Sequence, residues 1–502
     1  MSQRGKRLAL LALSILTLAP ACISSPREIA DDTSDVALSD MSPVIVSLVE
    51  RYDAPGLSVA VIRDGEIIFS EAYGSRDIET DAPVTTDTQF AIGSIVKSFT
   101  SGLVGTLQAD GTIDIDASPI AYVPGLVFGD DELSADLKLH HLLTQTSGLP
   151  VMDGSAAFFP AATQADLAPR FAAFGKSCRV GDCWSYNNMN FILLDMVAES
   201  ATRQSKSDLI KTRLLEPIGM TGTVSSTAEF LASANAAKPY GRSGGRTVPV
   251  AQEYLFGEHI YATADDMARW LAMWMNAGDV DGHQVIPTDY VTQAISMQAI
   301  SDGAPPQASD PHVHLFGYGY GWMVKSMDGN YVVNHGGNEN GFSAHVLFVP
   351  ASGLGIVALT NQQGSILPNI VTDMLARRLL NLAETPADTY PVRVTEITPL
   401  RADASTLSGS PISITKAQEG AYAAPGYGVV RIRLTGETVS LETPLANFAL
   451  VPLENSTFGL ATDAPVSAGV NLEYFQVAFL DRESPALSLN IAPEPVIFQK
   501  ID

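Results

Sequence analysis

The chain has 502 residues, of which 46% are hydrophobic and 17% charged, and its formal net charge is −25. One hydrophobic core seldom serves a chain of this length, so we expect two or three domains. Acidic residues are spread along the chain and no Lys/Arg-rich stripe opposes them. We therefore expect no nucleic-acid partner and no attraction to anionic membrane surfaces.

Residues 1–21 have the pattern of a signal peptide. Basic side chains at positions 4–7 precede an uncharged run at 8–18 that is too short to span a bilayer, and Ala19-Pro20-Ala21 offers a small-residue cleavage site. The protein is therefore expected to be exported, to the periplasm, the medium or the cell envelope. Cys22 follows this site directly, so a lipid anchor on Cys22 and simple secretion both remain open. Only such an anchor would bring the protein to a membrane.

The next segments predict a polar linker and then the first strands. Residues 22–40 are rich in Asp and Ser and read as a linker. Residues 56–74 predict two strands joined by a turn at Asp64-Gly65. After Ser94 the apolar residues recur at helical spacing as far as position 107, which predicts a helix.

The later segments complete a two-part organisation. Helical and loop stretches continue to about residue 276. Strand-like runs between 318 and 361 then predict an antiparallel meander, followed by a helix near 366–382. Strands at both ends with helices between them predict an α+β domain over 41–385, in which a cluster of helices flanks an antiparallel sheet.

The remainder of the chain reads as a separate small domain. Three prolines punctuate residues 386–405 and predict a second linker. Residues 406–502 alternate apolar and polar side chains with frequent turns, which predicts an all-β barrel or sandwich.

Ser94-Ile95-Val96-Lys97 is the first motif that carries chemistry. At the start of a helix, residues three apart lie on one face, so the Lys97 amine can reach the Ser94 hydroxyl. Serine needs such a base to act as a nucleophile at neutral pH. The N–H groups at the helix start also favour an oxyanion. These features make Ser94 the candidate nucleophile.

Two other serines match hydrolase patterns. Ser413 and Lys416 repeat the same spacing, but no amphipathic helix follows them. Ser243 lies in Gly241-Arg242-Ser243-Gly244-Gly245, which fits the nucleophile elbow of α/β-hydrolases. That elbow needs a buried strand before the serine and a helix after it, whereas the flanking residues here predict a loop. The sequence context therefore favours Ser94.

Tyr186-Asn187-Asn188 is the second motif, and it precedes a strongly apolar helix. A tyrosine held between cations can act as a general base, here toward Ser94. The Asn188 amide can orient Lys97 and the substrate. A surface tyrosine at a helix entry is the alternative interpretation.

His335-Gly336-Gly337 is the third motif, at the end of a predicted strand. The glycines let a substrate backbone approach the strand edge, and His335 offers a hydrogen bond or a titratable charge. The Asn338 N–H just beyond them could complete an oxyanion hole with the N–H of Ser94. A strand-end turn with a solvated histidine is the alternative.

Cys178 and Cys183 form a close pair, which in an exported protein suggests a local disulfide. A metal site would need further Cys or suitably spaced His nearby, and none is present. Two idle thiols remain the other possibility.

The motifs and their surroundings resemble the class C β-lactamase-like serine hydrolases, a group that includes penicillin-binding DD-peptidases, D-aminopeptidases and carboxylesterases. The resemblance covers roughly residues 41–385. The tail resembles the lipocalin-like barrel appended to some members, on GAYAAPGYGVVRIRL and the closing EPVIFQK. Segments that match in the family's order are PGLSVAVIRDGEII, TQFAIGSIVKSFT, HLLTQTSGLP, RLLEPIGMTGT, YATADDMARWL, YGYGW and HGGNENGFSAHVLFVP.

The resemblance implies roles and also three departures. It implies Ser94 as nucleophile, Lys97 and Tyr186 as proton-transfer partners, and Asn188 and His335 as positioning residues. His335 stands where β-lactamases and many DD-peptidases carry a lysine, which favours an esterase or another peptidase over a β-lactamase. Gln145 stands where many relatives have histidine, with no role assigned. The cysteine pair precedes Tyr186 where relatives tend to have a Pro-Gly turn.

We therefore expect an enzyme that cleaves a small ester, amide or peptide substrate through an acyl-enzyme, with no metal or organic cofactor. A D-stereospecific peptidase or a DD-carboxypeptidase acting on peptidoglycan-type peptides is the first alternative. A catalytically silent protein that binds peptidoglycan fragments is the second.

Overall fold

The structure is a computed structural model, and it describes the chain from residue 38 to residue 501 with gaps. Residues 1–37, including Cys22, and Ser413 lie outside the described part. Within that part, no helix combines the length and the apolar character needed to cross a membrane. The described residues are 38, 40–151, 164–172, 174–250, 259–306, 312–396, 416–436, 438–444, 446–453, 457–461, 476–480, 485–491 and 495–501.

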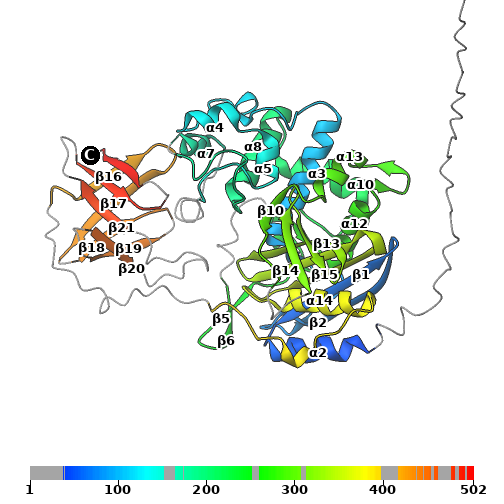
Figure 1. Cartoon of the computed structure of the whole chain (residues 1–502). Coiled ribbons are helices and arrows are strands. Elements are labelled where there is room, and N and C mark those ends of the chain that lie inside the picture. Colours follow the sequence, from blue (N-terminus) through cyan, green and yellow to red (C-terminus); the bar gives the residue numbers. More distant parts are fainter. Residues whose placement is uncertain are drawn as a thin grey trace, which may run out of the picture.

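A nine-stranded antiparallel sheet forms the centre of the larger domain, in the order β10-β11-β12-β13-β14-β15-β1-β2-β3 (Figure 1). The first strand of the domain, β1, pairs with β2 on one side and with β15, the last, on the other, with Leu57 opposite Thr360. The first and the last strand of the domain in sequence are thus neighbours inside the sheet. Its strands are β1 Gly56–Arg63, β2 Glu66–Asp77, β3 Ala82–Pro83, β10 Ala299–Asp302, β11 Val313–Tyr318, β12 Met323–Met327, β13 Asn330–Glu339, β14 Phe342–Val349 and β15 Leu354–Thr360.

The predicted hairpin at Asp64-Gly65 and the predicted meander from β12 to β15 are confirmed. Every residue of β14 and β15 is buried, which explains their nearly continuous apolar sequences. The sequence does not predict β10, which forms one edge of the sheet, or its neighbour β11. Their side chains are largely half-buried or exposed, so they lack the apolar alternation that marks a strand.

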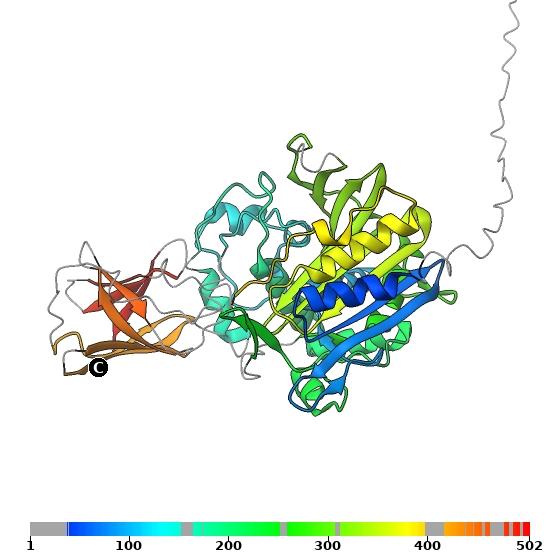
Figure 2. The ribbon, with the colours of Figure 1, turned by 90° about the horizontal axis from the view of Figure 1, so that it is seen from below.

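Helices cover both faces of the sheet. Helices α2 (Met41–Arg51) and α14 (Leu367–Leu379) lie side by side on one face, as Figure 2 shows, and share a core with β1 and β15. Helices α3 (Val96–Ala109) and α12 (Ala264–Met275) contribute to the core of the other face. The remaining helices are α4 Asp131–Asp136, α5 Leu139–Leu143, α7 Gln164–Phe171, α8 Asn188–Thr202, α9 Lys206–Ile210, α10 Glu216–Ile218, α11 Thr227–Ala232 and α13 Thr288–Ala294.

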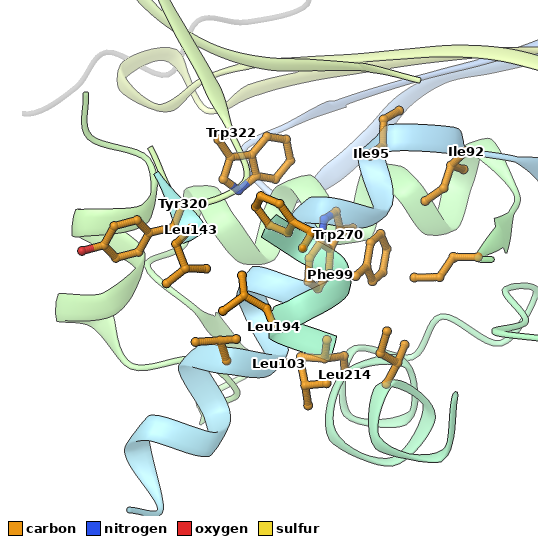
Figure 3. Close-up of a cluster of buried hydrophobic side chains, with 14 of the residues drawn as sticks. Ile92, Ile95, Phe99, Leu103, Leu143, Leu194, Leu214, Trp270, Tyr320 and Trp322 are labelled. Atoms are coloured by element: carbon orange, nitrogen blue, oxygen red, sulfur yellow. The ribbon is translucent and has the colours of Figure 1, made fainter. Parts of the chain in front are cut away.

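Helix α3 runs through the middle of this second core. Its residues from Lys97 to Leu107 are all buried, and Phe99 stacks on Trp270 of α12 with ring centroids 4.0 Å apart. Figure 3 shows these rings together with Ile92 and Ile95, which flank Ser94. The start of α3 is therefore held by packing at Ile92, Ile95 and Phe99, while Ser94 itself is half-buried.

The C-terminal part forms a closed eight-stranded barrel among the described residues, β16 to β23, with its own apolar core. It lies beside α4 and α7 in both Figure 1 and Figure 2. Buried Arg170 of α7 connects the two parts, because its Nε donates to the Gly426 carbonyl at 2.6 Å and its guanidinium lies 5.0 Å from the Tyr427 ring centroid. The barrel strands are β16 Gly420–Ala424, β17 Gly428–Thr435, β18 Thr438–Glu442, β19 Asn447–Pro452, β20 Thr457–Ala461, β21 Gln476–Leu480, β22 Ala486–Leu489 and β23 Val496–Lys500.

The segment around Ser243 corrects one expectation. It forms a small hairpin of β5 (Tyr240–Ser243) and β6 (Arg246–Pro249), where a loop was expected. Gly244 and Gly245 make the turn with positive φ angles, so no helix follows the serine as a nucleophile elbow requires. The other short strands are β4 Phe90–Ala91, β7 Tyr261–Ala262, β8 Asp279–Val280 and β9 His283–Gln284.

A mostly buried cluster of charged and polar side chains connects α3, which follows Ser94, with α8, which follows Tyr186. Asp195 of α8 accepts a hydrogen bond from Thr100 of α3 at 2.8 Å and from Lys206 of α9 at 2.6 Å. Burial raises the pKa of the Asp195 carboxyl, and the Lys206 charge opposes that rise. Removing the lysine would leave this carboxylate desolvated without its cation.

We expect Lys206→Met to lower the free energy of unfolding by about 3 kcal/mol, because it leaves one buried charge without its partner. Urea unfolding at neutral pH measures the effect. The matched control is Lys211→Met at an exposed position, which should change stability by less than about 0.5 kcal/mol. Equal stability of the two variants would contradict the prediction.

Candidate active site

Ser94 and Lys97 lie together at the entry to α3. Ser94 sits in a single 3₁₀ turn, Gly93–Ile95, that leads into the helix. Lys97, one turn later, is only 4% exposed. Its Nζ lies 3.3 Å from the Ser94 hydroxyl and donates to Asn188 Oδ1 at 2.7 Å. The spacing of the first motif therefore brings the amine to the serine, as expected.

The second motif meets the first at the start of α8. Asn187 caps this helix, since its Oδ1 accepts from the Met189 N–H at 3.0 Å. This cap places Asn188 against Lys97 and Tyr186 beside it, with Lys97 Nζ 4.8 Å from the centroid of the tyrosine ring. The lysine thus lies between an amide oxygen and an aromatic face, both of which favour a cation.

His335 of β13 lies across the site from these residues and is 1% exposed. Its ring centroid is 6.1 Å from that of Tyr186. Its Nδ1 lies 2.7 Å from the Gly336 carbonyl, which can only accept, so Nδ1 carries the proton. Its Nε2 then accepts from the Tyr318 hydroxyl at 3.4 Å.

Burial, with a further contribution from the Lys97 charge, lowers the pKa of His335 to about 3. The imidazole is therefore neutral at neutral pH and supplies no cation to the site. Burial likewise raises the pKa of Tyr318 well above its ordinary value, so this residue stays a phenol that donates to the histidine.

Two glycines allow the nucleophile turn to touch the edge of β13. Gly93 has a positive φ of 52°, and a Cβ there would lie 2.6 Å from the Asn338 nitrogen. A Cβ on Gly337 would lie 1.9 Å from the Ile92 carbonyl oxygen. A Cβ on Gly336 would meet only ordinary contacts, the nearest atom being 3.8 Å away. Of the two glycines in the third motif, only Gly337 is required by this close approach.

The same approach places the two expected oxyanion donors on one side of the site. Glu339 and Phe342 face each other across a two-residue turn, so the preceding pair, Asn338 and Ser343, falls in the position that makes no mutual backbone hydrogen bonds. The Asn338 N–H is then directed away from β14. That is the side on which Gly93 packs, immediately before Ser94.

Cys178 and Cys183 form a disulfide, with their Cα atoms 6.4 Å apart. The loop that it closes is fastened to the segment after α5, because the Gly181 N–H donates to the Thr146 carbonyl at 2.8 Å. Ser177, just before the disulfide, likewise donates from its N–H to Gly148 at 2.9 Å. The disulfide therefore secures the chain that leads to Tyr186.

Tyr318 was not recognised as a site residue from the sequence. Its signal is the segment YGYGW, which resembles a segment of the family but implies no role by itself. Its contact with His335 depends on the pairing of β11, β12 and β13, which no local pattern reveals.

A cavity of about 730 Å³ lies elsewhere, near the end of α12 and the β1–β2 turn, and none of the motif residues lines it. Residues that line it include Arg269, Met273, Asp279 and Gly353. In the part of the chain that the structure describes, no group of three or more His, Cys, Asp or Glu side chains is arranged to hold a metal ion.

The buried neutral His335 predicts a loss of stability in acid. An unfolded histidine binds a proton below about pH 6.5, whereas folded His335 does so only below about 3, so the unfolded state binds more protons between these values. Stability should fall as pH drops from 6.5, by up to about 3 kcal/mol at pH 4 from this residue. His335→Asn should reduce that acid-dependent loss. Urea midpoints at pH 7 and pH 4.5 measure it, and equal losses in both proteins would refute the assignment.

Comparisons with known proteins identify the family. The family model described as Beta-lactamase matches residues 42–381. Penicillin-binding protein 4 of Amycolatopsis lactamdurans is 27% identical over 74% of this chain and 97% of its own length. Protein flp of Staphylococcus aureus is 22% identical over 64% of this chain, which spans 63% of that relative's length.

Solved structures show the same fold. The octameric penicillin-binding protein homologue from Pyrococcus abyssi aligns with a TM-score of 0.60 at 20% identity, over 91% of this chain and all of that one. A penicillin-binding protein from Bacillus halodurans aligns with a TM-score of 0.56 at 21% identity, over 67% of this chain and 98% of that one. The expected α+β fold with an antiparallel sheet, a helical cluster and a C-terminal all-β domain is confirmed. The chain belongs to the β-lactamase family, with an eight-stranded barrel as its C-terminal part.

Proposed function

We propose that this protein is an exported serine hydrolase that cleaves an ester or amide bond through an acyl-enzyme on Ser94. The observation that carries the proposal is the position of Lys97 Nζ, which lies 3.3 Å from the Ser94 hydroxyl and is bonded to Asn188. Members of this family are serine hydrolases in general, and the chain retains a nucleophile with a base beside it.

In the first step, Ser94 Oγ attacks the substrate carbonyl carbon and its proton passes to the Lys97–Tyr186 pair, in which Tyr186 accepts it as a phenolate stabilised by the Lys97 ammonium. The bond to the leaving group breaks, and the alcohol or amine departs with a proton from the same pair. In the second step, water attacks the acyl carbon and gives a proton to the same pair, the Ser94 Oγ–acyl bond breaks, Ser94 takes that proton back and the carboxylic acid leaves. The N–H groups of Ser94 and Asn338 would hold the oxyanion in both steps, each typically contributing about 3 to 4 kcal/mol.

The neutral state of His335 bears on the substrate class. A lysine at this position would offer a fixed cation to a substrate carboxylate, whereas a neutral imidazole with a pKa of about 3 offers only a hydrogen bond. We therefore favour an uncharged small ester or amide as substrate over a β-lactam.

A D-stereospecific peptidase or DD-carboxypeptidase is the second candidate. The similarity to a protein described as Penicillin-binding protein 4 favours it, because the name of that protein says that it binds penicillin, a molecule with a free carboxylate. A silent protein that binds peptidoglycan fragments is the remaining candidate, and the labelling test below distinguishes it from an enzyme.

We expect a fluorophosphonate probe to label the mature protein on Ser94 and to leave Ser94→Ala unlabelled, because only an activated serine reacts with it. Ser243→Ala and Ser413→Ala are the matched controls and should label like the unchanged protein. Gel fluorescence and mass mapping of the labelled peptide provide the readout. Absence of labelling together with no turnover of p-nitrophenyl esters would contradict the proposal that the protein is an enzyme.

Substrate classes are separated by rates on short-chain esters, D-alanyl amides and a chromogenic cephalosporin. The proposal expects turnover of esters to be highest. Preference for the D-alanyl amides would favour the peptidase candidate.

The third motif offers a second test of the oxyanion arrangement. We expect Gly337→Ala to lower kcat/KM by at least about 100-fold, because its Cβ would collide with the Ile92 carbonyl and separate the strand edge that carries Asn338 from the turn that carries Ser94. Gly336→Ala, where space is available, should stay within about threefold of the unchanged protein, an estimate for a site that keeps its geometry. Equal losses in the two variants would argue against this role of the strand edge.

A further inference from the structure

Gln145 lies after α5 in an unusual backbone conformation and in full burial. Its φ is 61°, in the left-handed region that residues with a side chain rarely adopt, and it is 1% exposed. Such strain persists only where the surroundings fix it, and it tends to occur at functional sites. The contacts of Gln145 show what fixes it.

The backbone carbonyl and the side chain of Gln145 both accept hydrogen bonds from residues that flank Tyr186. Its backbone carbonyl accepts from the Ser185 N–H at 2.9 Å, on one side of the tyrosine. Its side-chain Oε1 accepts from the Asn187 N–H at 3.0 Å, on the other side. Gln145 therefore accepts hydrogen bonds from the residue immediately before the proposed base and from the residue immediately after it.

The same oxygen also anchors the first turn of α8. Oε1 accepts a second hydrogen bond, from Asn190 Nδ2 at 2.5 Å, and Asn190 Oδ1 accepts from Ser147 Oγ at 2.7 Å. A carbonyl oxygen has two lone pairs and can accept both bonds, whereas a neutral histidine offers one acceptor nitrogen. Glutamine at this position thus satisfies two buried donors that the histidine of many relatives could not satisfy with one atom.

The side chain of Gln145 also lies near the opposite wall of the site. Its amide is close enough to the Tyr318 phenol to lower the pKa of that group, against the larger upward effect of burial. Tyr318 in turn donates to His335. Gln145 therefore bonds directly to the loop of the base and lies near the tyrosine that donates to His335.

The geometry points to Gln145 as a positioning residue for catalysis: by bonding on both sides of Tyr186, it holds the phenol in place for proton transfer with Ser94 and Lys97. Gln145 acts through these neighbours and not on the substrate itself. This inference rests on the proposed hydrolase function.

Two substitutions at Gln145 separate the role of the oxygen from that of size. Gln145→Leu keeps the approximate volume and removes the acceptor, so Tyr186 should lose its fixed position. We expect the rate of fluorophosphonate labelling and kcat to fall by up to about 100-fold, with KM within about threefold, since no substrate contact is lost. Gln145→Glu keeps an acceptor for both donors and should recover most of the rate at high pH. Because a buried carboxylate near the phenols disfavours a second anion, its rate profile should shift to higher pH.

Gln362→Leu is the matched control. Gln362 is also fully buried, and its Nε2 donates to the Tyr52 and Asp53 carbonyls at 3.1 and 3.0 Å, at the C-terminal end of α2. This variant should lose stability but keep the labelling rate and the pH profile of the unchanged protein, measured below its melting temperature.

The outcomes distinguish this inference from the proposed function. If Gln145→Leu is folded and keeps the labelling rate and pH profile, the positioning role is wrong while the hydrolase proposal stands. If the unchanged protein itself is not labelled on Ser94, the hydrolase proposal fails first. If Gln145→Leu and Gln362→Leu lose the same fraction of the labelling rate, the loss follows from lower stability, and Gln145 has no positioning role.

Discussion

The site is organised around a lysine ammonium that the fold withdraws from water. Lys97 is 4% exposed, and transferring a charge of this kind from water costs several kcal/mol unless neighbouring groups replace the lost hydration. The Asn188 oxygen, the Ser94 hydroxyl and the face of the Tyr186 ring take that role. The same charge contributes to keeping His335 neutral. One buried cation thus sets the chemistry of each motif around it.

Backbone contact, rather than side-chain contact, brings the third motif to this cation. The turn before α3 and the edge of β13 touch at Gly93 and Gly337, where a side chain would collide with the opposing main chain. The turn is held by the stacked rings of Phe99 and Trp270 and the strand by its pairing in the sheet, so the native contact between them is well defined. The geometry of the oxyanion side is therefore a property of two rigid layers in direct contact.

The sequence predicted those parts of the site that short patterns encode. Ser94 and Lys97 are three apart on one helix, and the apolar run after Tyr186 marks the helix that Asn187 caps, so both segments could be assigned locally. The outer strands β10 and β11 carry few buried residues and gave no such pattern. Helix α2 was missed as well, because its segment is short and adjoins the polar linker.

The roles of Tyr318 and Gln145 could not be found in this way. Tyr318 meets His335 only through the pairing of three strands, and Gln145 meets Asn187 and Asn190 across 42 and 45 positions of sequence. Neither residue belongs to a motif whose spacing implies chemistry. The disulfide was suggested by its spacing, but its attachment to the segment of Gln145 was not.

The central position of β1 has a consequence for how the chain folds. The Thr360 hydroxyl donates to the Gly56 carbonyl 304 positions earlier, and β1 pairs with β15 from Leu57 to Arg63. A nascent chain that has not yet reached residue 360 therefore exposes one edge of its first strand and cannot complete the core on either face of the sheet. Contacts so distant in sequence slow folding, because the entropy of closing the loop is lost before any pairing energy is gained. Commitment of this domain to its native state is thus a late event, governed by the arrival of its final strand.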